Sequence, residues 1–174
     1  MASQSGIALS IRPQGIEALN AALSQMKRRD LKPALNDIGM SMVVATQRRF
    51  ETETDPLGRP WRPLSAVTLA ARAGGRLYIK SGKRLTAKAA KVINSGRILR
   101  DSARLYQSIT HAVSGQGVEI GSNLVYARIH QMGGQAGRGK KVTIPARPFL
   151  GLSKTDTQTC ADVLAGYLLT GRRA

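Results

Sequence analysis

The sequence predicts an α+β fold in which N-terminal helices and a C-terminal helix pack on a small, mostly antiparallel sheet, with a long basic arm or loop. Apolar residues recur at helical spacing toward both ends of the chain, and they alternate with polar residues in its C-terminal half. With 174 residues, of which 42% are hydrophobic, the chain is long enough to bury a core. We expect one domain over residues 1–174, with a core of aliphatic side chains because only 4% of residues are aromatic.

The N-terminal third predicts one strand and two helices. Residues 7–11 alternate between apolar and polar side chains, which indicates a short strand. Helical spacing then predicts helices over residues 16–29 and 31–50. The apolar stripe of the second consists of Leu35, Ile38, Met42, Ala45 and Phe50. Arg48 and Arg49 suit the negative end of its dipole. Both stripes are narrow, which favours packing on a core over binding to a membrane surface.

Turn signals and a short helix follow. Asp55–Gly58 has proline at its second position and glycine at its fourth, a pattern typical of a β-turn. Trp61 lies between two prolines in a segment that we expect to be extended. This only tryptophan either fills the edge of the core or anchors a neighbouring subunit. Ser65 is placed to cap a short helix over residues 66–72.

Residues 73–97 are predicted to form a basic arm inserted in the domain. Between Asp55 and Asp101 the chain has 11 Lys and Arg and no acidic residue, within a net charge of +17. Such a run favours contact with phosphate or an acidic protein surface. We expect a long loop that orders on assembly, with a short basic helix over residues 83–91 as the alternative. The side chains expected to contact a polyanion or acidic partner are Arg76, Lys80, Lys83, Arg84, Lys88 and Lys91.

The C-terminal half predicts a β-hairpin and a final helix. Residues 109–113 and 118–120 alternate around a Ser-Gly-Gln-Gly turn, which is typical of a hairpin. Further helices are expected over residues 99–106 and 155–169, and further strands or strand-like pieces over residues 142–144 and 149–152. The final helix carries Cys160, Val163, Leu164 and Tyr167 on one face.

Few residues suit catalysis or metal binding. The single Cys160 excludes an intrachain disulfide and fits a reducing cytoplasm. His111 and His130, the only histidines, lack the paired spacing of zinc ligands, so we expect them to pack or to form hydrogen bonds. Residues 134–141 nearly spell a phosphate-binding loop, but Lys141 replaces the required Ser or Thr and a strand-like stretch follows, so a mobile basic loop is expected. We expect no enzyme, cofactor or metal; a hydrolase using scattered Ser and His residues is the alternative.

No apolar run approaches the roughly 18 residues of a membrane span. The N-terminus also lacks a basic region followed by an apolar stretch, the pattern of a signal peptide. We therefore expect a soluble intracellular product without a membrane partner.

Residues 126–134 and 144–151 form the most informative pair of motifs. Two adjacent glycines end the first, where a Cβ would clash in a turn. Prolines fix φ on both sides of Arg147 in the second. We expect a rigid segment that holds Arg147 and Phe149 at fixed positions. Such a segment suits a packed subunit interface or an ordinary core segment.

Other motifs accompany this pair in a defined order. They are Phe50, Asp55–Leu64, Thr68–Leu69, Ile98–Ile109 and Val118–Gly121, followed by Tyr126–Gly134 and Ile144–Gly151. In order and spacing these stretches resemble the phage virion morphogenesis, or tail completion, family of Mu-like tailed phages. The chain departs from that pattern twice: residues 74–95 look like a basic insertion, and Ala103 stands where a glycine is expected.

The resemblance implies a structural virion protein rather than an enzyme. It would assemble in the host cytoplasm as a homo-oligomeric ring at the head–tail junction of the virion. There it would be a neck, tail completion or tail terminator subunit that contacts other neck, portal or tail proteins. Candidate intersubunit or core-edge anchors are Trp61, Tyr126, Arg128, Arg147 and Phe149. The alternative is a non-specific DNA-binding protein that applies the basic segment 72–100 to double-stranded DNA in the channel.

Overall fold

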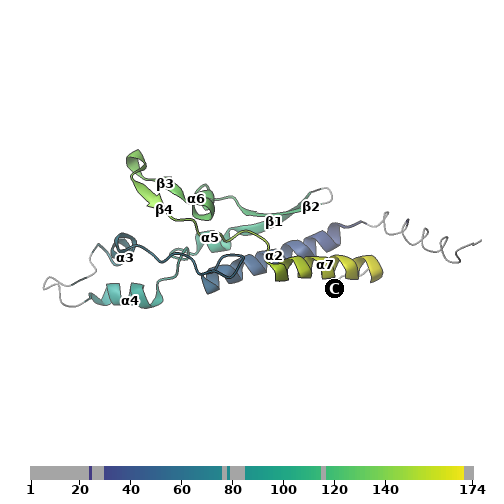
Figure 1. Ribbon diagram of the computed structural model, residues 1–174, viewed down its shortest axis with the longest axis horizontal. Helices are drawn as coiled ribbons and strands as arrows, with labels where there is room; N and C mark the ends of the chain where they lie inside the picture. Colours follow the sequence, from purple (N-terminus) through teal and green to yellow (C-terminus); the bar gives the residue numbers. More distant parts are fainter. Residues whose placement is uncertain (1–23, 25–29, 76–77, 79–84, 115–116, 171–174) are drawn as a thin grey trace, which may run out of the picture.

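The protein is described by a computed structural model that covers residues 24, 30–75, 78, 85–114 and 117–170. The predicted strand over residues 7–11 and nearly all of the helix over residues 16–29 lie outside these ranges. Helices α2 (Lys32–Thr52) and α7 (Lys154–Thr170) lie side by side, and strands β1 (Ile109–Ser114) and β2 (Gly117–Ser122) pack against α2 (Figure 1). The expected α+β class is confirmed.

Helix α2 is the central element and has the predicted extent. A proline occupies its first turn, where the missing N–H costs no hydrogen bond. The helix ends at Glu53, which adopts a left-handed conformation with φ of 57°. Leu35, Ile38, Met42 and Phe50 are buried as predicted, and Ala45 is half-buried. Arg49 lies in the last turn of the helix, as expected, and is buried as well.

The β1–β2 hairpin sits unusually close to α2. The two strands pair in antiparallel register, with Val113 opposite Val118, as the sequence predicts. The His111 ring lies over Gly39, where a Cβ would be 2.3 Å from the ring carbon Cδ2. Its Nε2 is 3.0 Å from Oδ1 of Asn36. His111 is therefore a packing and hydrogen-bonding residue, as expected.

The strands form two separate sheets instead of one. Strand β3 (Gly134–Ala136) pairs with β4 (Val142–Ile144), and a 3₁₀ turn, η1 (Arg138–Lys140), joins them. The strand over residues 142–144 is confirmed. The mobile basic loop expected over residues 134–141 is instead the tip and one strand of this second hairpin. Gly139, at φ of 70° within the turn, helps the chain to reverse between Ala136 and Val142.

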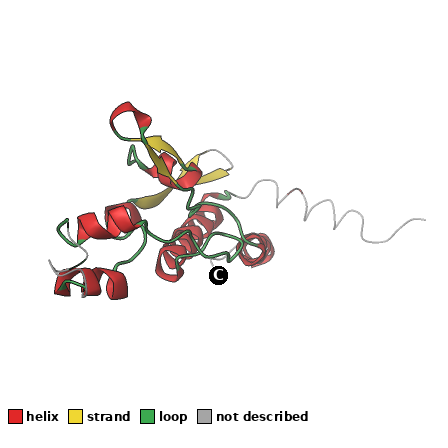
Figure 2. Cartoon of the chain, turned by 60° about the vertical axis from the view of Figure 1, so that its left-hand side comes forward, coloured by secondary structure: helices red, strands yellow, loops and turns green. Residues whose placement is uncertain are grey.

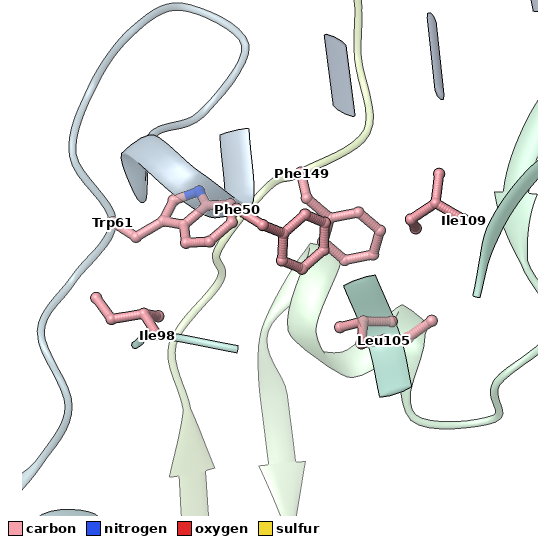
Figure 3. Packing of buried hydrophobic residues seen from close by; sticks show 7 residues of the cluster. Phe50, Trp61, Ile98, Leu105, Ile109 and Phe149 are labelled. Carbon is pink, nitrogen blue, oxygen red and sulfur yellow. The ribbon is translucent and has the colours of Figure 1, made fainter. Parts of the chain in front are cut away.

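Aromatic side chains form the centre of the core, despite their low number. Phe50 and Phe149 are fully buried with ring centroids 5.1 Å apart, and Trp61 meets Phe50 edge-on at 5.5 Å. Ile98, Leu105 and Ile109 surround them (Figure 3). Contrary to expectation, the core therefore does not rest mainly on aliphatic side chains, although Phe50 was placed on a core-facing stripe. Each ring buries a large apolar area, so three aromatic side chains can dominate a small core.

The predicted arm contains one helix, which forms a helical hairpin with the short helix just before the arm. Helix α3 (Ala66–Arg72) is capped by Ser65 as expected, and α4 (Ala87–Ser95) is capped by Thr86, whose hydroxyl accepts from Ala89 N at 3.1 Å. The two helices contact one another, and Ala73 and Ala89 are buried. A loop throughout residues 73–97 is therefore wrong, and the helix begins at residue 87 instead of 83. Figure 2 shows α3 and α4 as a pair apart from α2 and α7, with the strands on the same side of both pairs.

The helix predicted over residues 99–106 is shortened to α5 (Arg104–Gln107). Leu99 and Ala103 both have φ of 57°, which a continuous right-handed helix does not allow. Ala103 therefore occupies a left-handed position that glycine tolerates best, at the site where a glycine was expected. Helix α7 matches the predicted final helix closely.

Candidate interaction site

Side chains hold the backbone of residues 147–151, which contain no strand. The indole Nε1 of Trp61 donates to the Pro148 carbonyl at 2.9 Å. The Gln131 side chain accepts from the N–H groups of Phe149 and Leu150, at 2.9 and 3.0 Å, and donates to the Leu150 carbonyl at 2.8 Å. The strand-like piece expected over residues 149–152 is wrong, because side chains bond the backbone where a neighbouring strand would otherwise do so.

A buried ion pair completes this support. Arg49 donates Nη1 to the carbonyls of Phe149 and Gly151, at 3.0 and 2.8 Å, while its Nη2 pairs with the Asp156 carboxylate. Asp156 also accepts from Ser153 N at 2.8 Å, and Ser153 Oγ accepts from Asp156 N at 3.0 Å. This reciprocal arrangement is a capping box at the start of α7. Together, the ion pair and the capping box link the end of α2, residues 149–151 and α7.

Helix α6 (Ala127–Met132) supports the other side of the segment. The helix ends at Gly133, where φ is 73° and an added Cβ would lie 2.8 Å from the Ala146 nitrogen. The turn predicted at these glycines is confirmed, for the reason expected. Beyond it, the Arg147 N–H donates to the His130 carbonyl at 2.8 Å. The two motifs that dominate the sequence therefore pack directly on one another.

Arg147 is a buried cation without an ion-pair partner among the described residues. Its side chain is nearly inaccessible, at 5% exposure of the residue. Nε donates to the Arg62 carbonyl at 2.9 Å and Nη2 to the Pro63 carbonyl at 3.1 Å. Burial, followed by the nearby charges of Arg72 and Arg62, lowers the pKa of Arg147. These contacts use two of the five N–H donors of the guanidinium and leave its charge without a counter-charge.

Arg147 lies on a groove of about 620 Å³ between α3, α6 and β4. Its lining is basic, hydroxyl-bearing and apolar, and it consists of Arg62, Pro63, Leu64, Ser65, Thr68, Arg72, Leu99, His130, Val142, Thr143, Ile144, Pro145 and Arg147. None of these residues is acidic. The Nδ1 atom of His130 is buried here without a hydrogen bond to any described group. Burial, and then the charge of Arg147, lowers the pKa of His130, so its ring is neutral at pH 7.

The five predicted anchors divide into two groups. Trp61, Arg147 and Phe149 are buried within the chain itself, so Trp61 occupies the core position that was one of its two expected roles. Tyr126 and Arg128 are exposed around the start of α6. Their role in an interface stays a prediction. The structure does not bring the two groups into one surface.

The six basic arm residues are only partly described. Lys88 and Lys91 are exposed on α4. Arg76, Lys80, Lys83 and Arg84 lie outside the described ranges. Arg72, which was not singled out from the sequence, fixes the arm to the body: Nη1 donates to the Arg97 carbonyl at 2.8 Å, and Nε lies 3.4 Å from the Asp101 carboxylate.

Sequence reasoning missed Arg49, Asp156 and Gln131. A signal existed for the first, because Arg49 falls three residues after buried Thr46 on the apolar stripe of α2. The spacing of Ser153 and Asp156 before an apolar helix was a second signal. Nothing local marks Gln131, whose partners lie 18 and 19 residues further along the chain.

Over the described ranges, no three His, Cys, Asp or Glu side chains are grouped so that they could hold a metal ion. No helix in this part of the chain has the length and apolar character that a bilayer crossing requires. A phosphate-binding loop at residues 134–141 is also ruled out, because a strand and not a helix follows the turn.

Comparison with known proteins matches the phage virion morphogenesis family over residues 14–169. The chain belongs to this family. It is 43% identical over 100 residues to the Mu-like prophage FluMu G protein 2 of Haemophilus influenzae, covering 58% of the chain and 64% of that protein. It is 30% identical over 126 residues to the putative capsid assembly protein G of Escherichia phage Mu, covering 71% of the chain and 70% of that protein. No solved structure matches.

Family membership confirms the resemblance read from the motifs. The matched range includes residues 147–151 and every side chain described above as bonding their backbone. The chain spans just under two thirds of the Haemophilus relative. The conclusion at this level is a role in phage virion morphogenesis.

Proposed function

We propose that this virion morphogenesis protein is a structural subunit of the head–tail junction and that it assembles there as a homo-oligomeric ring. The family match over residues 14–169 carries the proposal. The Mu relative's description as a putative capsid assembly protein also supports a structural role. A neck, tail completion or tail terminator subunit must bind copies of itself and other particle proteins, which requires unpaired surface on a rigid body.

The outer side of α6 provides such a surface. Arg128 and Met132 are exposed four residues apart on the helix, and Met132 is 71% exposed. Val125, in the turn just before the helix, is 97% exposed. Exposed apolar side chains around an arginine are typical of protein interfaces. His130 and Gln131 of α6 form hydrogen bonds with residues 147–150, so the outer face of the helix is presented in a fixed orientation. We assign it as the contact between neighbouring subunits.

The decisive experiment is deletion of the gene from the phage, followed by imaging of the lysate. Loss of joined particles, with heads and tails still formed separately, is the expected result. Wild-type protein supplied in trans should restore joining, whereas Val125→Asp with Met132→Asp should not. Leu169→Asp is the matched control, because Leu169 is an equally exposed apolar residue on α7. Complete, infectious particles from the deletion phage would rule the proposal out.

A second function, non-specific DNA binding, is favoured by one observation. Lys88 and Lys91 are exposed on α4, in the helical hairpin that stands apart from the α2–α7 pair (Figure 2). Six phosphate contacts by the basic segment predict a slope of roughly −5 in a plot of log affinity against log salt concentration. Neutralising Lys88 and Lys91 to Gln should make that slope shallower by about 2. A slope near zero for the wild-type protein would exclude DNA as the partner of the arm and leave an acidic protein surface.

A further inference from the structure

The groove beside Arg147 carries more positive charge than the surrounding chain neutralises. Arg62, Arg72 and Arg147 all line it, while none of its lining residues is acidic. Within the described ranges, the only carboxylate paired with any of these arginines is Asp101, which binds Arg72 and is largely exposed. Holding a guanidinium away from water without a counter-charge costs free energy. An anionic group bound from outside would supply the missing charge.

The position of Arg147 restricts what that anion can be. Its guanidinium is anchored to the Arg62 and Pro63 carbonyls at the base of the groove, and the residue is only 5% exposed. Phosphates on a DNA duplex belong to a wide, stiff cylinder, which reaches exposed side chains far more readily than a buried one. A carboxylate on a flexible side chain enters a narrow groove easily. It also matches the planar fork of an arginine.

The walls of the groove match a peptide for a second reason. Strand β4 lines it with Val142, Thr143 and Ile144, and β3 is its only partner strand among the described elements. One edge of β4 is thus open to an extended chain, which would add as a further strand. Leu64 and Leu99 contribute apolar surface for alternate side chains of such a chain.

We propose that this groove binds an extended, acidic peptide segment of another virion component, with a carboxylate of the peptide held by Arg147 and Arg62. The peptide backbone runs along the open edge of β4. The inference rests on the proposed function only for the source of the peptide. Binding itself depends on the groove alone and is measured with the purified full-length chain.

A fluorescent peptide of about six residues that alternates valine and aspartate is a suitable probe, because it extends to roughly 20 Å as a strand. Its control is the same peptide with asparagine for aspartate. We expect the acidic peptide to bind at least about tenfold more tightly in fluorescence anisotropy, since charge-assisted bonds to carboxylate are the stronger kind. Equal binding of the two peptides overturns the proposal.

Two variants test the assigned arginines. Arg62→Gln removes an exposed charge from the rim, and about fivefold weaker binding is expected. Arg147→Lys keeps the positive charge but loses the planar guanidinium fork, so a further loss of peptide affinity is expected. The tryptophan fluorescence of this variant must show that its core is intact. Arg48→Gln, an exposed arginine on α2 outside this groove, is the matched control and should change affinity less than twofold. If it weakens binding as much as Arg62→Gln does, the effect is general charge and the proposal fails.

Competition distinguishes the other anions. A short DNA duplex or inorganic phosphate should displace the peptide poorly from wild-type protein at matched ionic strength. If the duplex displaces the labelled peptide at a lower concentration than unlabelled peptide does, and Arg62→Gln abolishes this displacement, the groove binds nucleic acid. That result would overturn the peptide assignment. These outcomes do not depend on the deletion experiment, which tests the head–tail role and leaves peptide affinity unchanged.

Discussion

Arg49 and Asp156, 107 positions apart, form a buried ion pair that closes the core around Phe149. Arg49 comes from the last turns of α2, and Asp156 from the first turn of α7. Between them the Arg49 guanidinium also binds two carbonyls of the segment that follows Pro148. One side chain therefore joins the end of α2 to residues 149–151 and to the start of α7, which lie 100 to 107 positions further along the chain.

Breaking this pair from either side should be costly. Asp156→Asn leaves a buried guanidinium without its counter-charge, and we expect a loss of about 3–5 kcal/mol in the free energy of unfolding. Arg49→Met should cost at least as much, because two carbonyls also lose their donor. Urea unfolding followed by the fluorescence of Trp61 measures both. The double variant should lose less than the sum of the single losses by more than about 1 kcal/mol.

The matched control for that pair is Arg59 with Asp55. Arg59 is largely exposed, so Arg59→Gln should change stability by no more than about 1 kcal/mol. Strictly additive losses for Arg49→Met and Asp156→Asn would show that the two side chains do not act together.

The effect of Gly39→Ala on stability should change sign when the His111 ring is removed. Gly39→Ala places a methyl group within the His111 ring and should destabilise the wild-type protein by about 1–3 kcal/mol, the range of overpacked cores. In a His111→Ala background that obstacle is gone. The higher helix propensity of alanine should then stabilise α2 by up to about 1 kcal/mol. Thermal unfolding of the four proteins gives the comparison, and an equal loss in both backgrounds would contradict it.

The protein should become more stable when Ala103 is replaced by glycine. Its φ of 57° is strained for a residue with a Cβ, and relief of that strain is worth about 1 kcal/mol. The expected result is a higher unfolding midpoint for Ala103→Gly. Ala71→Gly, at an exposed position inside α3, is the opposite control and should be neutral or destabilising. A lower midpoint for Ala103→Gly would argue against strain at this residue.

His130 should make stability depend on pH in a window below neutrality. Burial, and then Arg147, lowers the pKa of His130 in the folded protein, while the unfolded value is about 6.5. Below that pH the unfolded chain binds a proton that the folded chain does not, so the free energy of unfolding falls as pH falls. Unfolding in urea at a series of pH values between about 7.5 and 5 should show this decline, and His130→Gln should flatten it.

Asp55 affects stability in a separate, lower range of pH. Burial raises the pKa of Asp55, but hydrogen bonds from Arg59 and Leu57 outweigh that effect and hold it below its usual value. The stability that Asp55 contributes is present above an unfolded pKa of about 3.9 and is lost as pH falls further. A decline above pH 5 that persists in His130→Gln would therefore contradict the assignment to His130.

Local patterns were enough to predict most of the regular elements. The stripe of α2, the Ser65 cap, the β1–β2 hairpin and α7 depend on spacing within a few residues, and each was predicted close to its observed bounds. The strand expected over residues 149–152 failed because Gln131 and Trp61, which bond that backbone, are 18 and 87 residues away. The groove beside Arg147 was missed for the same reason. Arg62, Arg72 and Arg147 come together only after three elements have packed.

The order of synthesis gives this arrangement a further meaning. Phe149 fills the middle of the hydrophobic cluster, and Asp156 supplies the counter-charge to Arg49. A chain still attached to the ribosome lacks both until residue 156 has emerged, 107 positions after Arg49. The residues made earlier can form helices and a hairpin, but the hydrophobic core cannot pack while Phe149 is missing. Under the proposed function, a subunit should thus become competent to assemble only after α7 has begun to be made, which keeps products truncated before α7 out of particles.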